Sequence, residues 1–411
     1  MSIGSDLLPV EDARARALAL ASPLPAEWAR LEEALGRALA ADVRAQRTLP
    51  PWDNSAMDGY AVRSADLTGQ LPARLTILET IHAGGTPRHE LRPGTCARIM
   101  TGAPLPAGAD AVVMQERTKP GAPGETPPTV EILEAVAAGA FVRPRGEDAR
   151  AGEPLLVQGT PLGIPEVGLL TGQGMSLVPV PRRPRVAILS TGDELCRADE
   201  PPEGRIVDTN GPALALAVSR AGGLPTVLGI ARDTLEEVSS RLAAAQGFDV
   251  VLTSAGVSVG ERDFVKAALE QQGVEMNFWR VAIKPGKPLA VGRRGATLYF
   301  GLPGNPTSSL VTFELFVRPV LRRLQGHTDV EPPRVPGRLE GELRKPPGLA
   351  HYIRVAASWR EGELWVRPLA TQTSGALRSA ASATHLLHFP RSANSLTHGA
   401  HVELLPVSWS A

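Results

Sequence analysis

Short apolar runs alternate with stretches of helical length between about residues 181 and 327, and this alternation constrains the fold more than any other feature of the chain. Strands that alternate with helices of about 10–15 residues form a parallel sheet that helices cover on both faces. Ligands bind such sheets at the carboxyl ends of the strands. The expected strands are 185–189, 225–230, 250–253, 277–283, 289–291 and 297–300, and the expected helices are 210–222, 234–246, 263–272 and 307–324.

The rest of the chain is predicted to be mainly β-structure after an initial helix at residues 9–22. Residues 26–45 predict a second helix, because Trp28, Leu31, Leu35 and Leu39 recur at helical spacing. Proline, glycine and short β-type runs dominate up to about residue 180. They return after residue 328, where a small barrel or sandwich is expected. The predicted fold is therefore multidomain α/β plus β: a doubly wound, mostly parallel α/β domain flanked by β-rich domains and a C-terminal β-barrel-like domain.

Charge and cysteine content exclude several classes of protein. Lys plus Arg number 43 and equal the 43 Asp plus Glu, so no broad basic surface is expected for nucleic acid or an anionic membrane. Two cysteines cannot build a disulfide framework or a zinc cluster. We therefore expect a reduced, cytoplasmic protein without nucleic-acid or membrane partners, which binds any anion through a local arrangement of residues.

Residues suited to anion chemistry follow the predicted strands. The first strand leads into STGDEL (190–195) with its two acids, and the third leads into a glycine-rich turn, SAGVSVGERD (254–263). Two lysines lie between prolines in KPGKP (284–288), and the last strand leads into GLPGNPTSS (301–309) at a helix start. Each pattern alone also suits a tight turn or a capped helix. Together they predict one pocket for a phosphorylated ligand and Mg²⁺, which prefers carboxylate and phosphate oxygens.

One loop in the β-rich region is also a candidate. The segment PPWDNSAMDGYAV (50–62) holds polar residues without periodicity, which is typical of a structured functional loop as well as of a plain turn. The eight histidines are scattered, and His385 and His388 lie in an apolar run where packing roles are expected.

These segments, taken in series, resemble the molybdopterin molybdenumtransferase family, which includes MoeA and the related domain of gephyrin. PPWDNSAMDGYAV, STGDEL, AGVSVGERDF, AIKPGKP and GLPGNPTSS carry the resemblance, which covers essentially the whole chain. It implies that the protein inserts molybdate into adenylylated molybdopterin and releases AMP, with Mg²⁺ as cofactor. It also implies a homodimer whose active cleft is shared between subunits, and leaves open contacts with other cofactor-assembly proteins.

The resemblance assigns roles to individual residues. The acids that match positions around the pyrophosphate and Mg²⁺ are Glu194, Asp233 and Asp263. The matches to the phosphate-binding loop are Gly256, Ser258 and Gly260. The matches to the oxyanion and substrate site are Arg280, Lys284, Lys287, Pro288, Ser308, Arg354 and Ser374. Asp58 and Thr101, with Asp148 a weaker match, correspond to positions that the partner subunit contributes.

Three positions depart from the family pattern, and one of them is Trp52, which replaces the common Phe. Ala255 stands where glycine is usual, so we expect it to avoid positive φ. Arg280 stands where lysine is frequent; the charge is kept, but the planar guanidinium binds oxyanions differently.

The resemblance also suggests a division into domains. It implies an N-terminal helix on the α/β domain (1–25), a linking and dimerisation domain (26–45 with 153–180) and a β-rich domain that serves the partner's active site (46–152). The α/β molybdopterin-binding domain (181–327) and a C-terminal β domain (328–411) complete the chain.

Three other functions compete with this interpretation. A molybdopterin adenylyltransferase would share the α/β domain, but such enzymes are usually much shorter. A non-catalytic cofactor-binding scaffold would not need the intact acids and lysines. A nicotinamide-dependent oxidoreductase would carry the GxGxxG fingerprint, which the glycine-rich turn lacks. The sequence does not distinguish molybdate from tungstate as the substrate.

Overall fold

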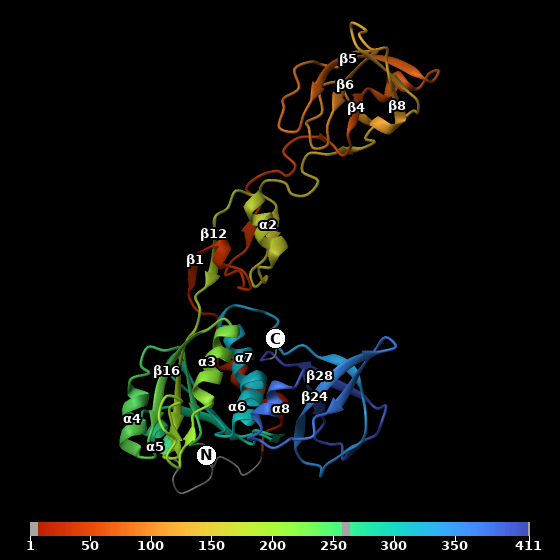
Figure 1. Ribbon diagram of the computed structural model, residues 1–411. Helices are drawn as coiled ribbons and strands as arrows, with labels where there is room; N and C mark the ends of the chain where they lie inside the picture. The colour runs from red at the N-terminus through yellow and green to blue at the C-terminus, as the bar shows by residue number, and fades with distance from the viewer. Residues whose placement is uncertain (1–6, 257–263, 410–411) are drawn as a thin grey trace. The chain divides into compact units, whose positions relative to one another are not determined.

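The computed structural model describes residues 7–256 and 264–409 (Figure 1). The chain divides into two compact units. Unit 1 comprises Met1–Ala41, Gln158–Val167 and Leu177–Ala411, and unit 2 comprises Asp42–Val157 and Gly168–Ser176. Within the described residues, every helix is too short or too polar to span a bilayer.

A six-stranded sheet forms the centre of the α/β domain in unit 1, with the order β16-β13-β17-β21-β20-β18. The first four strands in this order are parallel, and β20 and β18 are antiparallel to their neighbours. The bounds are β13 (Arg185–Thr191), β16 (Leu224–Ala231), β17 (Val250–Ser254), β18 (Glu275–Arg280), β20 (Pro288–Arg294) and β21 (Thr297–Leu302). The predicted mostly parallel sheet is confirmed.

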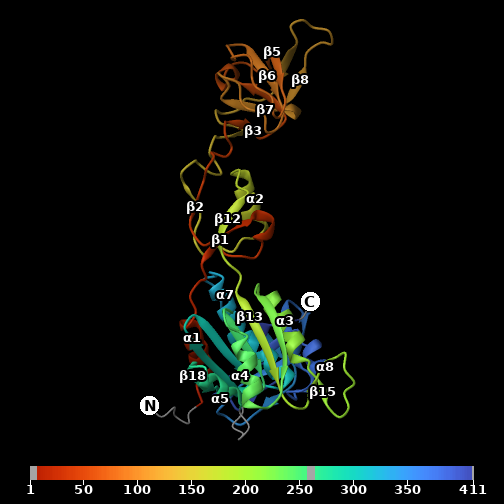
Figure 2. The same cartoon turned by 90° about the vertical axis from the view of Figure 1, so that its left-hand side faces the viewer.

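Helices cover both faces of this sheet (Figure 1, Figure 2). Val186 and Ile188 of β13 pack in one buried cluster with α1, α3, α6 and α7. Ala187 and Leu189, which point to the opposite face, pack in another cluster with α4 and α5. The bounds are α1 (Val10–Ala19), α3 (Asn210–Arg220), α4 (Leu235–Ala243), α5 (Phe264–Gln271), α6 (Pro306–Thr312) and α7 (Arg318–Leu324). The doubly wound architecture is therefore confirmed.

The predicted long helix at 307–324 forms as α6, a π-helical segment (Phe313–Val317) and α7 in direct succession. Glu314 lies in the π segment and is fully buried. Its carboxylate accepts hydrogen bonds from Arg318 and Ser408. Burial raises the pKa of Glu314, and the positive charge of Arg318 opposes this shift.

The predicted helix at residues 26–45 is wrong. Ala26–Arg30 form β1, which pairs antiparallel with β12 (Leu177–Pro181). Trp28 is 69% exposed and Leu35 is 60% exposed, so the apolar period does not mark a buried helical face. Gly36 has φ of +76°, a conformation that ends a right-handed helix. Pairing with a strand about 150 residues away overrides the local periodicity.

Unit 2 contains a six-stranded sheet with the order β7-β4-β6-β5-β9-β8. The bounds are β4 (Gly59–Val62), β5 (Ala73–Ile81), β6 (Thr95–Ile99), β7 (Ala111–Met114), β8 (Thr118–Pro120) and β9 (Thr129–Ile132). Two buried apolar clusters stabilise it, one around Val113 and the other around Ile99. The predicted β-rich character of this region is confirmed.

Several shorter elements lie before the α/β domain, and two short strands, β14 and β15, follow β13 within it. They are β2 (Val43–Arg44), β3 (Asn54–Ser55), β10 (Val142–Arg143), β11 (Pro154–Leu156), α2 (Ile164–Gly172), β14 (Leu195–Cys196) and β15 (Ile206–Val207).

The C-terminal strands close into a barrel. Neighbouring strands are hydrogen-bonded in the order β24-β25-β22-β28-β26, and β26 pairs with β24 to close the ring. The short strand β19 also pairs with β24. The bounds are β19 (Ile283–Lys284), β22 (Val335–Leu339), β23 (Leu343–Arg344), β24 (Ala350–Arg360), β25 (Glu363–Pro368), α8 (Leu377–Ala381), β26 (His385–Phe389), β27 (Ser395–Leu396) and β28 (His401–Pro406). The barrel-like C-terminal domain is confirmed.

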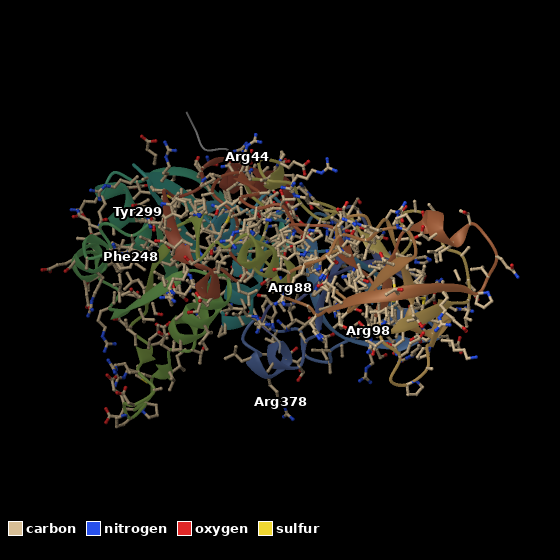
Figure 3. All side chains as sticks on the ribbon, turned by 90° about the horizontal axis from the view of Figure 1, so that it is seen from above. Arg44, Arg88, Arg98, Phe248, Tyr299 and Arg378 are labelled. Atoms are coloured by element: carbon tan, nitrogen blue, oxygen red, sulfur yellow. The ribbon has the colours of Figure 1, made fainter. Side chains whose placement is uncertain are left out.

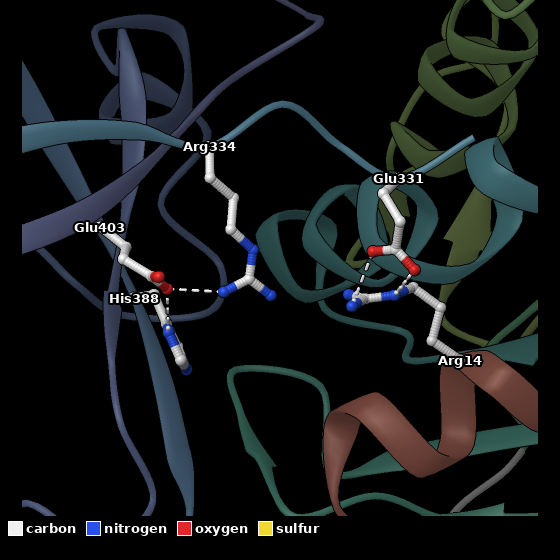
Figure 4. Close-up of polar contacts among 5 residues, drawn as sticks. All are labelled: Arg14, Glu331, Arg334, His388 and Glu403. Atoms are coloured by element: carbon white, nitrogen blue, oxygen red, sulfur yellow. Dashed lines mark hydrogen bonds and ion pairs between the residues drawn. The ribbon is translucent and has the colours of Figure 1, made fainter. Parts of the chain in front are cut away.

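Two polar clusters join neighbouring elements of unit 1 (Figure 4). Arg14 of α1 donates to Glu331 in the segment before β22, with nitrogen–oxygen distances of 2.7 and 2.9 Å. Glu403 accepts from Arg334 at 2.5 Å and lies 3.2 Å from Nδ1 of His388. The His388 ring also stacks on Tyr352 with centroids 5.2 Å apart, which agrees with the packing role expected for it.

We predict that Leu252→Ala destabilises the α/β domain. Leu252 lies in the central strand β17 and is fully buried, so the substitution leaves a cavity between sheet and helices. The expected loss is about 2–5 kcal/mol in the free energy of unfolding. Urea-induced unfolding measures this loss, with Leu216→Ala, at a side chain 72% exposed on α3, as the control. Equal stability of the two variants would contradict the assigned core.

Candidate functional site

A cavity of about 420 Å³ lies at the carboxyl ends of β13, β17 and β21 in unit 1. These strands are parallel neighbours, so the loops that follow them meet at one edge of the sheet. The cavity is lined by Thr191, Glu194, Leu195, Ile206, Val207, Asp208, Thr209, Asn210, Ser254, Ala255, Gly256, Pro288, Pro303, Gly304, Asn305 and Pro306. The site residues Glu194, Gly256 and Pro288 therefore lie around one space.

A buried amide forms the polar base of this cavity. Nδ2 of Asn210 donates to Oγ of Ser254 at 2.6 Å and to the carbonyl oxygen of Gly304 at 2.7 Å. Oδ1 of Asp208 accepts the N–H groups of Asn210 and Gly211 at 3.0 and 3.1 Å. The Asp208 carboxylate thereby satisfies N–H groups at the start of α3.

The glycine-rich turn begins with two residues in the left-handed region. Ala255 has φ of +77° and Gly256 has φ of +71°, so the prediction that Ala255 avoids positive φ is wrong. The N–H of Ala255 donates to the Leu302 carbonyl at 3.1 Å, which fixes the turn against β21. This hydrogen bond helps offset a backbone cost of about 1–2 kcal/mol for alanine. A Cβ on Gly256 would lie 2.2 Å from Val265, so only glycine fits there.

Acids from two strand ends meet beside the cavity. Glu194 lines it and is exposed. Oδ1 of Asp193 accepts the backbone N–H of Asp233 at 3.2 Å, and its carbonyl accepts from Arg232 at 2.9 Å. The ends of β13 and β16 are thus held together, which brings Asp233 next to the turn that carries Glu194.

The segment 284–288, called the lysine loop below, lies between the α/β domain and the barrel. Lys284 is in β19 beside His351 of β24, and burial together with the charge of Lys284 lowers the pKa of His351 to about 4. A Cβ on Gly286 would lie 2.4 Å from Thr312 of α6, so this loop packs directly against that helix. Pro288 at the end of the loop lines the cavity, whereas Lys284 and Lys287 do not.

Arg354 and Ser374 connect the barrel to α6. The guanidinium of Arg354 is buried and donates to Ser379 and to the carbonyls of Thr371 and Thr373 at 3.0–3.1 Å. The carbonyl of Ser374 in turn accepts the N–H and the hydroxyl of Thr307 at 3.0 and 2.7 Å. In this structure Arg354 holds the loop that carries Ser374.

The predicted site residues Arg354, Ser374 and Ser308 therefore lie on segments that contact one another. Ser308 follows Thr307 in α6, is 3% exposed and lies in the turn next to Thr312. Arg280 is exposed at the end of β18, where it pairs with Pro288 of β20. Ser258, Gly260 and Asp263 lie outside the described residues.

Asp58 and Thr101 form a cluster of their own in unit 2. Oδ1 of Asp58 accepts the N–H of Thr101 at 2.7 Å and its hydroxyl at 2.8 Å. These bonds, the backbone one most, hold the pKa of the exposed Asp58 below its ordinary value, and the charge of Arg98 (Figure 3) acts in the same direction. Asp148 also lies in unit 2, where its N–H donates to the Leu49 carbonyl at 3.0 Å.

The 50–62 loop is an ordered part of unit 2. Ser55 exchanges backbone hydrogen bonds with the 100–105 segment: its N–H donates to Ala103 at 3.0 Å and its carbonyl accepts from Gly102 at 2.8 Å. The side chain of Asp53 accepts the N–H of Arg145 at 2.6 Å. These bonds bring Asp58 and Thr101 together from separate segments.

The sequence interpretation missed several residues of the cavity. Asp208 and Asn210 were visible only as part of a helix start, a pattern that indicates capping and not a pocket. Ile206 and Val207 line the cavity although they are 60% and 38% exposed. Their only sequence signal is two apolar residues within a charged loop at 197–208.

We predict that Thr101→Val raises the pKa of Asp58 toward that of an ordinary aspartate. The variant keeps the shape and the backbone N–H donor but loses the hydroxyl donor to the carboxylate. Carboxyl ¹³C NMR titration measures the shift. Thr68→Val, which removes a hydroxyl bonded to the Ala65 carbonyl, is the matched control. A pKa of Asp58 that stays the same in Thr101→Val would refute this account of its depression.

Comparisons with known proteins agree with this geometry. Family profiles match residues 8–174 (MoeA N-terminal region, domains I and II), 187–323 (probable molybdopterin binding domain) and 336–407 (MoeA C-terminal region, domain IV). The chain is similar to the molybdopterin molybdenumtransferase of Haemophilus influenzae, with 39% identity over 85% of both chains. It is 33% identical to that of Bacillus subtilis over 97% of this chain and 94% of the relative.

Solved structures give the same result. A crystal structure of the molybdopterin biosynthesis MoeA protein from Pyrococcus horikoshii matches 98% of this chain and 100% of its own, with a TM-score of 0.84 and 29% identity. On the strength of these matches and of the site described above, the chain belongs to the molybdopterin molybdenumtransferase family.

Proposed function

We propose that this protein inserts molybdenum from molybdate into adenylylated molybdopterin and releases AMP. The observation that carries the proposal is the cavity at the sheet edge. It is lined by Gly256 of the glycine turn (254–256), by Glu194 of the acidic turn (190–195) and by Pro288 at the end of the lysine loop. The curated relatives from Haemophilus influenzae and Bacillus subtilis are named for this transfer. The site and the named relatives support the same reaction class.

Each part of the site contributes a different interaction. The turn at 254–256 and the loop at 303–306 line the cavity, and Gly256 and Gly304 leave the backbone there without side chains, as a phosphate-binding loop requires. Lys284 and Lys287 are exposed cations on either side of Gly286, which packs against α6 near Ser308, and such cations suit a tetrahedral oxyanion such as molybdate. Placed next to the phosphoryl group, these charges offset the negative charge that develops as the phosphoanhydride breaks.

Mg²⁺ is proposed as the cofactor, and the carboxylates at the cavity suit it. Among residues 7–256 and 264–409, no group of three or more His, Cys, Asp or Glu could hold a metal ion. Mg²⁺ commonly uses one or two carboxylates and completes its shell with water and substrate phosphates. Glu194 and Asp233 would hold it here. When bound, the ion would neutralise charge on the phosphoryl oxygens.

The proposal is tested by incubating the protein with adenylylated molybdopterin, Mg²⁺ and molybdate, and measuring AMP with and without the oxyanion. We expect molybdate-dependent AMP release, and we expect Asp233→Ala to lose orders of magnitude of it because an acid at the phosphoryl group is removed. Asp12→Ala, an exposed acid on α1, is the control. Consumption of ATP with molybdopterin and no need for molybdate would instead identify an adenylyltransferase. No release in any arm would favour a scaffold.

We further propose that the protein is a homodimer in which the partner subunit supplies Asp58 and Thr101 to the cleft. Exposed apolar side chains in unit 1 support self-association: Ile164 is 81%, Trp28 69% and Leu35 60% exposed. An interface formed by a twofold axis would bury the same surface on both subunits.

Mixed dimers test the shared cleft. Asp58→Ala and Asp233→Ala subunits, each inactive alone, are co-expressed with different affinity tags and assayed for AMP release. A shared cleft leaves one intact site in each mixed dimer, so about a quarter of wild-type activity should return with random pairing. If each site lies within one chain, no mixed dimer holds an intact site and activity stays absent. Sedimentation of the wild type as a monomer would also contradict the proposal.

A further inference from the structure

Asp208 and Asn210 lie at the base of the cavity, and the function proposed above assigns neither of them a role. Asn210 is the first residue of α3 and is 8% exposed. Its amide nitrogen has two protons, and they are donated to two different loops: one to Ser254 at the end of β17 and one to Gly304 before α6. The partners are 44 and 94 residues away in sequence. One side chain thus joins two walls of the cavity.

Asp208 extends this connection to the acidic turn. Its N–H donates to the carbonyl of Cys196 at 2.9 Å, while the N–H of Ile206 donates to the carbonyl of Glu194 at 2.7 Å. Its carboxylate holds the N–H of Asn210. Hydrogen bonds therefore run without a break from the segment carrying Glu194, through Asp208 and Asn210, to the 254–256 turn and the 303–306 loop.

The N–H of Ala255 fixes the 254–256 turn to the Leu302 carbonyl, and the amide of Asn210 also links this turn to the 303–306 loop. Ala255 and Gly256 are in the left-handed region, and Gly304 has no side chain with which to hold its own position. Without Asn210 the carbonyl of the exposed Gly304 would hydrogen-bond to water instead, and the loop would lose this link to α3. A loop that is ordered before binding spares the ligand the entropy cost of ordering it.

We propose that Asn210 is a positioning residue for substrate binding, which holds the 254–256 turn and the 303–306 loop at their spacing around the substrate. This inference rests on the proposed function, because the substrate is taken to be adenylylated molybdopterin. Asn210 does not contact the reacting atoms in this account. Its loss should therefore weaken binding much more than it slows the chemical step in the filled site.

The test separates binding from turnover. Dissociation constants for adenylylated molybdopterin are measured by titration without molybdate, and single-turnover AMP release is measured at saturating substrate with molybdate. Asn210→Ala should raise the dissociation constant about tenfold and change the saturated rate less than about threefold. Asn277→Ala, the same change at an exposed position of β18, is the matched control and should match the wild type.

Two more variants separate the two arms of the amide. Ser254→Ala removes only the bond to β17 and should raise the dissociation constant about threefold. Asn210→Asp keeps the size, and the Ser254 hydroxyl can turn to donate to it, but a carboxylate oxygen then faces the Gly304 carbonyl. It should bind at least as weakly as Asn210→Ala. If Asn210→Ala fails to fold, Ser254→Ala decides the question alone.

The outcomes are distinguishable from failure of the proposed function. A wild type that binds the substrate but releases no AMP with molybdate refutes the proposed function and leaves the binding comparison intact. Wild-type dissociation constants in both Asn210→Ala and Ser254→Ala refute the positioning role. So does a loss of the saturated rate with unchanged binding, since that pattern belongs to a group acting on the transition state.

Discussion

The parallel order of β16, β13, β17 and β21 is the constraint on which the site depends. Because these strands run in one direction, their carboxyl ends share one edge, and the loops that leave them are neighbours in space. The acidic turn after β13, the glycine turn after β17 and the loop after β21 then surround one cavity. The chemistry of each loop is local, but their proximity is a property of the sheet.

Helix α6 joins this cavity to the barrel. It begins at Pro306, at the end of the 303–306 loop. Thr312 in its last turn packs against Gly286 of the lysine loop, and Thr307 in its first turn donates to the carbonyl of Ser374. Arg354 stabilises the same barrel loop through buried bonds to two of its carbonyls. A buried guanidinium with several acceptors is costly to replace, because each lost bond leaves a carbonyl without a donor. The start of α6 is thus supported from the barrel.

Unit 2 presents a different kind of site residue. Asp58 keeps a low pKa although it is exposed, because Thr101 donates twice to one of its oxygens. That arrangement keeps the carboxylate ionised and fixed in direction. This preorganisation needs the ordered contacts between the 50–62 and 100–105 segments.

Local sequence patterns predict the alternation of strands and helices in the α/β domain, the β-rich character of its neighbours and the motifs around the cavity, since periodicity and turn chemistry are local properties. They fail at residues 26–45, where β1 pairs with β12 far along the chain, and at Ala255, whose turn is fixed by the Leu302 carbonyl. The bonds of Asn210 to Ser254 and Gly304, and of the Arg354 guanidinium to the loop that carries Ser374, follow only from the folded chain. These bonds depend on which distant segments become neighbours in the folded chain, and a local pattern of residues does not contain that information.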